Sequence, residues 1–171
     1  MNRAVFLDRD GTLMEEVCYC GDPAQVKTYP GAADALRKLK KAGFLLFIVT
    51  NQSGIGRGLI TEAQYHAVQA ELMRQLGESL VDASYFCADS PDVDSARRKP
   101  EPGMVLEAAR KFEIDLSHSF LIGDKSSDVE CGRRAGTRTI QVMTGYGLEQ
   151  RSAADFIARN VVEASQIVLG L

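Results

Sequence analysis

Short apolar runs alternate along this chain with longer stretches in which apolar residues recur at helical spacing. Five of the runs end in polar residues or glycine, which is typical of buried strands. These predicted strands span residues 4–7, 44–50, 83–87, 119–122 and 139–143. Between them, the apolar spacing predicts helices over residues 32–42, 61–76, about 100–112 and 129–135. The pattern after residue 148 is compatible with helix.

The order of these elements predicts one architecture. Strands that alternate with helices indicate a doubly wound α/β fold, with a mainly parallel sheet and helices on both faces. No internal repeat, linker or low-complexity segment interrupts residues 1–171, so we expect a single domain. A chain of 171 residues is long enough to bury a substantial core.

Polar residues come after four of the predicted strands, beyond their carboxyl ends. In a parallel sheet these ends meet at one edge, which is where open α/β proteins place their chemistry. The polar pairs that we expect to converge there are Asp8 with Asp10, Thr50 with Asn51, Arg98 with Lys99, and Asp124 with Asp128.

The first pair suits phosphoryl chemistry. If the chain stays extended past residue 7, the Asp8 and Asp10 carboxylates project to one side and Arg9 to the other. One aspartate, kept ionised by a bound cation, can attack phosphorus while the other lends and recovers a proton. On spacing alone, an equally good interpretation is a turn whose side chains lie in water.

Composition and charge limit the classes of molecule that we expect this protein to bind. Hydrophobic residues make up 45% and charged residues 25% of the chain, as in ordinary globular proteins. The net charge is -3 and there is no long basic block, so we expect neither nucleic acid nor an anionic membrane as a partner. No apolar run reaches the length of a membrane span and the N-terminus lacks a signal-peptide layout, which predicts a cytoplasmic protein. We expect it to be a monomer.

Four separated motifs together resemble those of the haloacid-dehalogenase-like superfamily of phosphohydrolases. More narrowly, they are similar to the branch of histidinol phosphatases and D,D-heptose 1,7-bisphosphate phosphatases. The motifs are Asp8-Arg-Asp-Gly-Thr12, Thr50-Asn-Gln-Ser-Gly54 with Arg57-Gly58, Arg98-Lys-Pro-Glu-Pro-Gly-Met104, and Gly123-Asp-Lys125. The resemblance covers about residues 4–147 and implies a Rossmann-like core without a cap domain.

The resemblance also implies roles for the matched residues. Asp8 is expected to be the nucleophile and Asp10 the proton donor and base, while Thr50 and Lys99 hold the phosphoryl oxygens. The other expected substrate-binding residues are Tyr19, Asn51, Gln52, Ser53, Arg57, Arg98 and Lys125.

A Mg²⁺ cofactor follows from the same resemblance. Its expected ligands are Asp8, the main-chain carbonyl of Asp10, and Asp124, which offer the hard oxygen atoms that Mg²⁺ prefers. Asp128 is expected to orient Lys99 or a water on the metal rather than to bind the ion directly.

The expected substrate is a phosphorylated small molecule. D-glycero-D-manno-heptose 1,7-bisphosphate, losing its 7-phosphate, is the first choice by motif similarity, and histidinol phosphate or another small phosphomonoester is the alternative. A phosphorylation-dependent regulatory module is an alternative of another class, because receiver domains also place acids, a Thr and a Lys on a doubly wound sheet. Asp10 disfavours that alternative, because a built-in base shortens the lifetime of an aspartyl-phosphate.

The sequence departs from this branch in a loop where many members bind zinc through Cys-x-His and Cys-x-Cys. Cys87 remains at the first position, but Asp89 and Ser90 stand where histidine is expected. Ser95 and Arg97 occupy the second pair. One thiolate cannot close a tetrahedral site, so we expect no structural zinc.

Residues 15–19 depart as well. Tyr19 is retained, but Glu15 and Glu16 bring two acids to the expected entrance of the site. They would repel a second phosphate on the substrate unless they face away from it.

Overall fold

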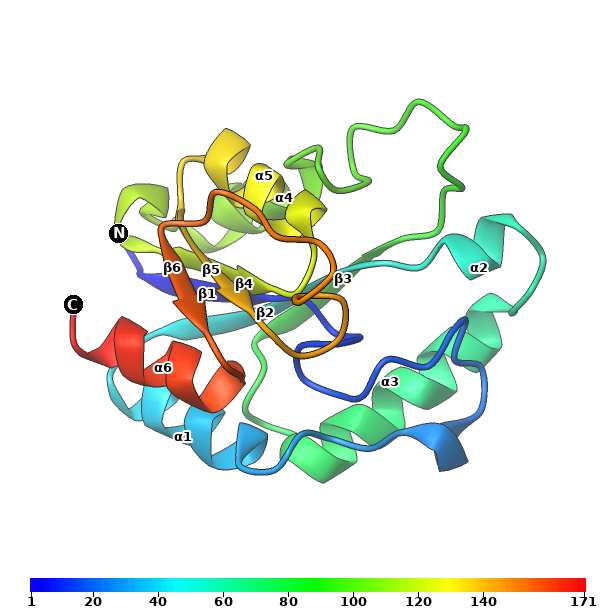
Figure 1. Cartoon of the computed structure of the whole chain (residues 1–171), viewed down its shortest axis with the longest axis horizontal. Helices are drawn as coiled ribbons and strands as arrows, with labels where there is room; N and C mark the ends of the chain where they lie inside the picture. The colour runs from blue at the N-terminus through cyan, green and yellow to red at the C-terminus, as the bar shows by residue number, and fades with distance from the viewer.

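The computed structural model describes all 171 residues and is built on one six-stranded sheet in which every strand pair is parallel (Figure 1). The strand order is β3-β2-β1-β4-β5-β6. The strands are β1 Ala4–Leu7, β2 Leu45–Asn51, β3 Ala83–Cys87, β4 Phe120–Gly123, β5 Arg138–Val142 and β6 Phe156–Ala158. The predicted doubly wound α/β class is confirmed.

Helices cover both faces of this sheet (Figure 1). The α-helices are α1 Ala32–Lys41, α2 Ser53–Gly56, α3 Glu62–Leu76, α4 Gly103–Phe112, α5 Ser126–Ala135 and α6 Val161–Leu169. Two 3₁₀ turns, Pro23–Gln25 and Leu116–His118, lie in the connections. None of these helices has the length and apolar character needed to cross a membrane.

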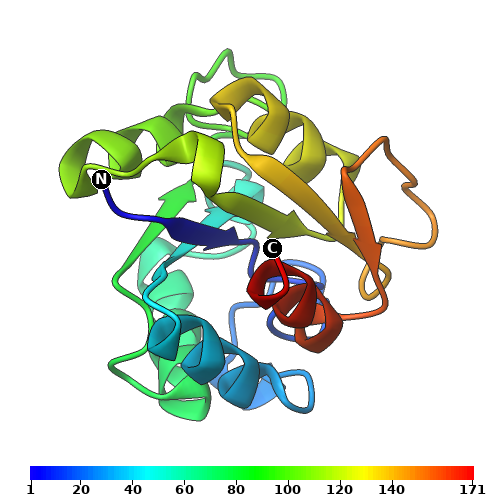
Figure 2. The ribbon, with the colours of Figure 1, turned by 90° about the vertical axis from the view of Figure 1, so that its left-hand side faces the viewer.

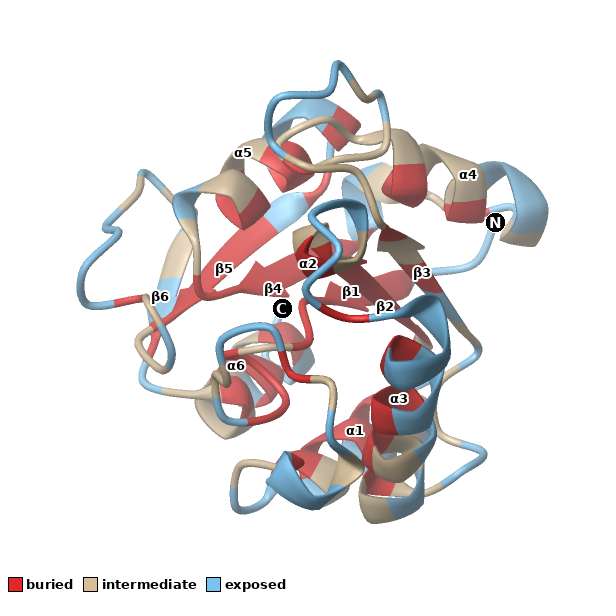
Figure 3. Cartoon of the chain, turned by 90° about the vertical axis from the view of Figure 1, so that its right-hand side faces the viewer, coloured by how far each residue is buried: buried red, intermediate tan, exposed pale blue.

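Side-chain alternation along the strands builds two separate cores. In β1, Val5 and Leu7 pack into the larger core beneath α1, α3 and α6, whereas Ala4 and Phe6 pack into the smaller core beneath α4 and α5. All four residues are fully buried, as are most positions of the neighbouring strands (Figure 3). A strand buried on both faces must be apolar throughout, which explains why β1 reads as a continuous apolar run.

Two predicted boundaries have clear physical causes. Thr61 begins α3 with a capping box, in which its side chain accepts from the Gln64 backbone N–H and the Gln64 side chain accepts from the Thr61 N–H. Gly136 ends α5 in the left-handed region, at φ 87°. At its other end, α5 begins at Ser126, one turn earlier than predicted, because the Lys125 backbone N–H donates to the Asp128 side chain.

The interpretation of the C-terminal part as helix was incomplete. Residues Phe156–Ala158 form β6, which pairs with β5 at the edge of the sheet, and only Val161–Leu169 are helical. Asp155 precedes β6 and accepts hydrogen bonds from the Thr139 backbone N–H and hydroxyl. These long-range contacts, rather than any local pattern, fix the short strand.

The sheet order creates a switch point between β1 and β4. From β1 the chain adds β2 and β3 on one side, and it then returns to add β4, β5 and β6 on the other. The residues that follow β1 and β4 therefore become neighbours at the carboxyl edge. The connections after β1 and β3 contain no inserted cap domain, and both chain ends lie on one side of the molecule (Figure 2).

We predict that Phe47→Ala lowers the free energy of unfolding by about 3–5 kcal/mol, because it removes a fully buried ring from the smaller core. The Phe47 ring lies 5.3 Å from Phe6 and 4.9 Å from Phe112, centroid to centroid. Urea unfolding measures the loss. Leu148→Ala is the control, since Leu148 is 67% exposed, and it should change stability by less than about 0.5 kcal/mol. Equal effects of the two variants would contradict this account of the core.

Candidate active site

A buried cluster of charged residues lies at the switch point. Lys99 reaches it from the loop before α4, and its Nζ lies 2.8 Å from Asp8 Oδ1 and 2.6 Å from Asp128 Oδ1. The Lys99 ammonium also donates to the Val49 carbonyl oxygen at 2.8 Å. Asp124, which follows β4, completes the cluster, and one oxygen from each of the three aspartates lies within 4.8 Å of the others.

Three glycines leave room for these carboxylates, and one of them is Gly145, where a Cβ would lie 2.3 Å from Asp124 Oδ2. A Cβ on Gly11 would lie 2.3 Å from Asp124 Oδ2, and Gly11 has a φ of +81°. A Cβ on Gly123 would lie 2.3 Å from the Asp128 side chain. The glycine that follows Asp10 therefore does more than turn the chain, because it also lets the backbone approach Asp124 closely.

Mutual repulsion and burial dominate the electrostatics of the cluster. Burial, followed by the Asp8 and Asp128 carboxylates, raises the pKa of Asp124 to about 8. Burial and Asp8 also raise the pKa of Asp128. Burial would raise the pKa of Asp8, but the Lys99 and Lys125 ammonium groups outweigh it and hold that pKa below its usual value. The cluster thus holds more carboxylate charge than the nearby cations neutralise.

These residues fit a divalent cation. Asp124 Oδ2 accepts from the Tyr146 backbone N–H at 2.8 Å, whereas the buried Oδ1 has no partner in the chain. A buried carboxylate oxygen without a partner, next to two further carboxylates, is a hard-oxygen donor set suited to Mg²⁺. The Asp10 carboxylate does not belong to this set of three. We expected Asp10 to bind the ion through its main-chain carbonyl oxygen instead, and that remains a prediction.

Asp10 is held differently from the way the spacing suggests. The strand ends at Leu7, and the Arg9 carbonyl then accepts three successive backbone N–H groups, so the chain turns instead of staying extended. Arg9 consequently folds back onto Asp10, with Nε 2.9 Å from Oδ2 and Nη2 3.1 Å from Oδ1. The condition under which Arg9 would project away from the aspartates, an extended chain past residue 7, is therefore not met.

The residues at the end of β2 support their neighbours. Gln52 Nε2 donates to both Asp10 Oδ2 and Thr50 Oγ1 at 2.9 Å. Asn51 forms two hydrogen bonds with the main chain of Lys99, accepting from its N–H and donating to its carbonyl oxygen, each at 3.0 Å. In this structure the Asn51 and Gln52 side chains thus position other site residues.

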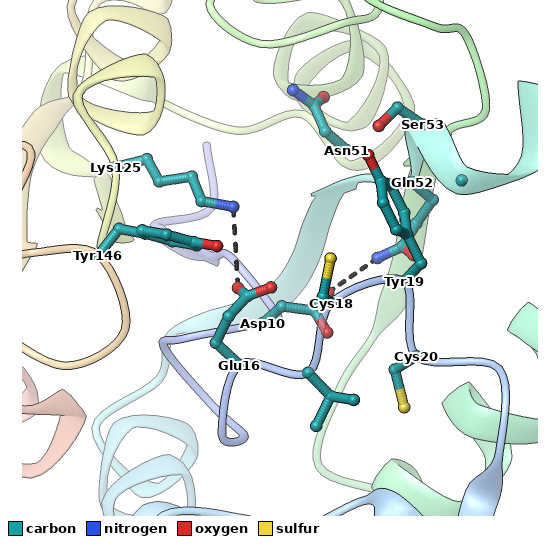
Figure 4. A pocket seen from close by; sticks show the side chains of 12 residues that line it. Asp10, Glu16, Cys18, Tyr19, Cys20, Asn51, Gln52, Ser53, Lys125 and Tyr146 are labelled. Carbon is teal, nitrogen blue, oxygen red and sulfur yellow. Dashed lines mark hydrogen bonds and ion pairs between the residues drawn. The ribbon is translucent and has the colours of Figure 1, made fainter. Parts of the chain in front are cut away.

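Two adjoining cavities open at this edge. The first, the Lys99 cavity, measures about 190 Å³ and is lined by Asp8, Thr50, Arg98, Lys99, Ser127 and Asp128, among others. The second, the Tyr146 cavity, measures about 180 Å³ and is lined by Glu16, Cys18, Tyr19, Cys20, Gln52 and Tyr146, among others (Figure 4). Both cavities are also lined by Asp10, Asn51, Ser53 and Lys125.

Lys125 and Glu16 face each other across the Tyr146 cavity (Figure 4). The Lys125 Nζ lies 3.8 Å from Glu16 Oε2 and 4.8 Å from the centre of the Tyr146 ring. Burial raises the pKa of Glu16. Glu15 is exposed. Of the two acids expected at the entrance, Glu16 therefore faces the cavity, whereas Glu15 does not line it.

Not all the expected substrate-binding residues line these cavities. Tyr19, Asn51, Gln52, Ser53, Arg98 and Lys125 do. The Arg98 guanidinium is braced by the Asp89 carbonyl oxygen at 3.1 Å. Arg57 lines neither cavity, and its guanidinium lies 6.0 Å from the centre of the Tyr19 ring.

The loop after β5 contributes residues that the motif analysis did not find. Tyr146 binds Asp124 through its backbone, and Thr144 donates from its hydroxyl to the Gly11 carbonyl oxygen at 2.6 Å. Within β5 itself, the Gln141 side chain donates to the Asp124 carbonyl oxygen at 3.1 Å. The fifth predicted strand could have pointed to these residues. Residues 144–147 follow its carboxyl end and therefore reach the same edge of the sheet as the other polar clusters.

Side-chain hydrogen bonds organise the loop after β3, where we expected the zinc-ligand pattern of the resembled branch to be altered. The Cys87 thiol lies 3.3 Å from Asp89 Oδ2 and 3.6 Å from Ser95 Oγ. The Ser95 hydroxyl oxygen accepts from the Arg97 backbone N–H at 3.3 Å. These contacts link the first and second positions of the altered motif, while the absence of zinc stays a prediction.

Comparison with known proteins identifies the family to which the chain belongs. Residues 96–164 match the family model described as HAD-hydrolase-like. The D-glycero-beta-D-manno-heptose-1,7-bisphosphate 7-phosphatase of Haemophilus influenzae is 36% identical, over 98% of this chain and 97% of that protein. Its namesake in Escherichia coli strain K12 is 37% identical, over 96% of this chain and 93% of that protein.

Solved structures show the same fold. The crystal structure of D,D-heptose 1,7-bisphosphate phosphatase from B. bronchiseptica, complexed with magnesium and phosphate, has a TM-score of 0.91 and 28% identity. The alignment covers 98% of each chain. The corresponding enzyme from Burkholderia thailandensis has a TM-score of 0.74 and 27% identity, over 99% of this chain and all of that one.

The chain therefore belongs to the haloacid-dehalogenase-like family and is a phosphatase. Within that family, the curated relatives that it matches over nearly its whole length are named heptose bisphosphate 7-phosphatases.

We predict that Mg²⁺ stabilises the protein more at pH 8 than at pH 6. Asp124 has a folded-state pKa of about 8, above its ordinary value, so folding favours its protonated form. The stability that this proton supplies is present at low pH and is lost as the pH rises through 8, and we expect the ionised Asp124 to bind the metal above that pH. Thermal unfolding with Mg²⁺ and with a chelator measures the difference, and Mg²⁺ at 100 times its Kd should add about 2.7 kcal/mol.

Asp124→Asn is the matched variant for this prediction. Its side-chain oxygen can still accept from the Tyr146 N–H, but it carries no charge. Without metal at pH 8 it should unfold at a higher temperature than the unmodified protein, and Mg²⁺ should not shift it. If Mg²⁺ still raised the unfolding temperature of Asp124→Asn, Asp124 would not be a ligand of the metal.

We also predict that protein purified without added metal contains no stoichiometric zinc, because Cys87 is the only cysteine at the altered loop motif. Elemental analysis by mass spectrometry measures this directly. One zinc ion per chain that is lost in Cys87→Ser would show that the loop still binds metal.

Proposed function

We propose that this chain hydrolyses a phosphomonoester through an aspartyl-phosphate on Asp8, with Mg²⁺ as cofactor. The observation that carries the proposal is the geometry of Asp8. Its Oδ1 accepts from the Lys99 ammonium at 2.8 Å, no side chain of the protein hydrogen-bonds to its Oδ2, and the residue lines the Lys99 cavity. A carboxylate with one oxygen anchored and the other available is suited to in-line attack on phosphorus.

In the first step, Asp8 Oδ2 forms a bond to phosphorus as the ester P–O bond breaks. The electron pair of that bond leaves on the alcohol oxygen, which takes a proton from Asp10. Lys99 and Lys125 lie beside the developing phosphoryl charge, and the Thr50 hydroxyl can donate to a further oxygen. Fixed groups of this kind are worth about 3 kcal/mol each in the transition state.

Asp8, Asp124 and the Asp10 carbonyl would hold the Mg²⁺ ion. When bound, it supplies positive charge that neutralises phosphoryl oxygens and keeps the surrounding carboxylates ionised.

In the second step, Asp10 takes a proton from a water molecule that attacks the phosphorus of the aspartyl-phosphate. The bond between phosphorus and the Asp8 oxygen breaks, and inorganic phosphate is released. Asp10 lines both cavities, so it lies where the transferred group and the leaving alcohol meet. This built-in base is the feature that separates a phosphatase from a receiver-like regulatory module.

We propose D-glycero-D-manno-heptose 1,7-bisphosphate as the substrate, with the 7-phosphate in the Lys99 cavity. The names of the relatives support this choice. The sugar would then occupy the Tyr146 cavity between Tyr19 and Tyr146, and its hydroxyl groups could donate to Glu16. The 1-phosphate would lie beyond Glu16, toward solvent.

We further propose that the protein acts as a cytoplasmic monomer, without nucleic acid or membrane as a partner. Residues of one chain line both cavities, so the proposed site needs no second copy.

We predict that the purified protein, tested with Mg²⁺ against a panel of sugar mono- and bisphosphates, releases phosphate fastest from the heptose bisphosphate. Asp8→Asn should abolish this activity, because a neutral amide is a poor nucleophile and loses the charge partner of Lys99. Asp94→Asn removes an exposed acid from the loop before Lys99 and is the matched control, which should keep full activity. Higher activity on histidinol phosphate would show that histidinol phosphate, and not the heptose bisphosphate, is the substrate. Unchanged turnover in Asp8→Asn would overturn the mechanism.

A further inference from the structure

Arg9 is a fully buried cation directly beneath the proposed site. It has 0% exposed surface and pairs with Asp10 through two of its three guanidinium nitrogens. Its guanidinium carbon lies 5.3 Å from the centre of the buried Tyr65 ring. Tyr65 in turn packs against Phe86, with ring centroids 4.3 Å apart. The planar group is thus fixed on one side by an aromatic stack and on another by the carboxylate.

The pairing leaves the two oxygens of Asp10 in different states. Oδ2 accepts from Arg9 Nε at 2.9 Å and from Gln52 Nε2 at 2.9 Å, whereas Oδ1 accepts only from Arg9 Nη2, at 3.1 Å. A carboxylate oxygen has two acceptor positions, so Oδ2 is filled and Oδ1 retains a free one. Asp10 lines both cavities, and Oδ1 is therefore the atom available to exchange a proton with the reacting oxygen.

We propose that Arg9, with Gln52, is a positioning residue that fixes Asp10 so that Oδ1 faces the leaving-group oxygen. A planar guanidinium suits this task, because its two parallel N–H groups hold a carboxylate in one plane, which a lysine ammonium cannot do. This inference rests on the proposed two-step hydrolysis and names the residues that orient its acid and base.

A purely structural role explains the arrangement less well. The third nitrogen of Arg9, Nη1, is buried without a partner in the chain. Leaving a buried donor unpaired is destabilising, and a well-packed apolar residue would fill the same space without that cost. The orientation of the guanidinium therefore matches the Asp10 carboxylate and leaves one of its own nitrogen atoms without a hydrogen-bond partner.

The test separates proton donation from the rest of the chemistry. An alkyl phosphate needs a proton on its poor leaving group, whereas p-nitrophenyl phosphate expels a stable anion without one. We expect Arg9→Lys and Arg9→Met to slow Asp8 phosphorylation by the sugar phosphate at least about 100-fold in single-turnover experiments. The pre-steady-state burst of p-nitrophenolate should change by less than about threefold. Gln52→Met should shift the ratio of the two rates in the same direction, but less.

Arg37→Met, at an exposed position on α1, is the matched control and should leave both rates unchanged. An equal fall of both rates in the Arg9 variants would overturn the proposal and show that Arg9 only supports the fold. If Arg9→Met does not fold, Arg9→Lys and Gln52→Met decide by the same ratio. If the unmodified protein hydrolyses neither compound, the proposed function fails, which is a different outcome from the failure of this inference.

Discussion

The Lys99 ammonium, buried between Asp8 and Asp128, is the interaction on which the arrangement of the site depends. It joins three elements that are far apart in the sequence, since Asp8 follows β1, Lys99 precedes α4 and Asp128 lies in α5. Removing one partner from a buried ion pair leaves an uncompensated charge and is strongly destabilising. The cluster therefore ties the first strand to the second half of the sheet while it orients the nucleophile.

The same cluster limits stability. Asp124 adds a third buried carboxylate that Lys99 does not contact, and its raised pKa shows that the folded chain alone does not favour its ionised form. A sequence selected only for stability would place an amide there. The acid is explained by a function that supplies a cation from outside, and this conflict between stability and activity is common at active sites.

The sequence predicted the central strands and the four polar clusters well, because the signals there are local. A strand buried on both faces must be apolar, and its polar carboxyl end is visible beside it. β6 was not predicted, since three residues carry no periodicity and their position depends on pairing with β5. The contact of Arg9 with Asp10 was missed because it arises from the turn after Leu7, and Tyr146 acts through a backbone N–H that every residue type except proline possesses.

The most direct test of the central claim is to locate the phosphoryl group during turnover. The protein is mixed with a phosphate-labelled substrate and Mg²⁺, quenched in acid within milliseconds, and mapped by peptide mass spectrometry. We predict a phosphoryl group on the Asp8 carboxylate that hydroxylamine removes, as expected for an acyl phosphate. A label on any other residue, or steady phosphate release with no labelled protein at any time point, would contradict the account.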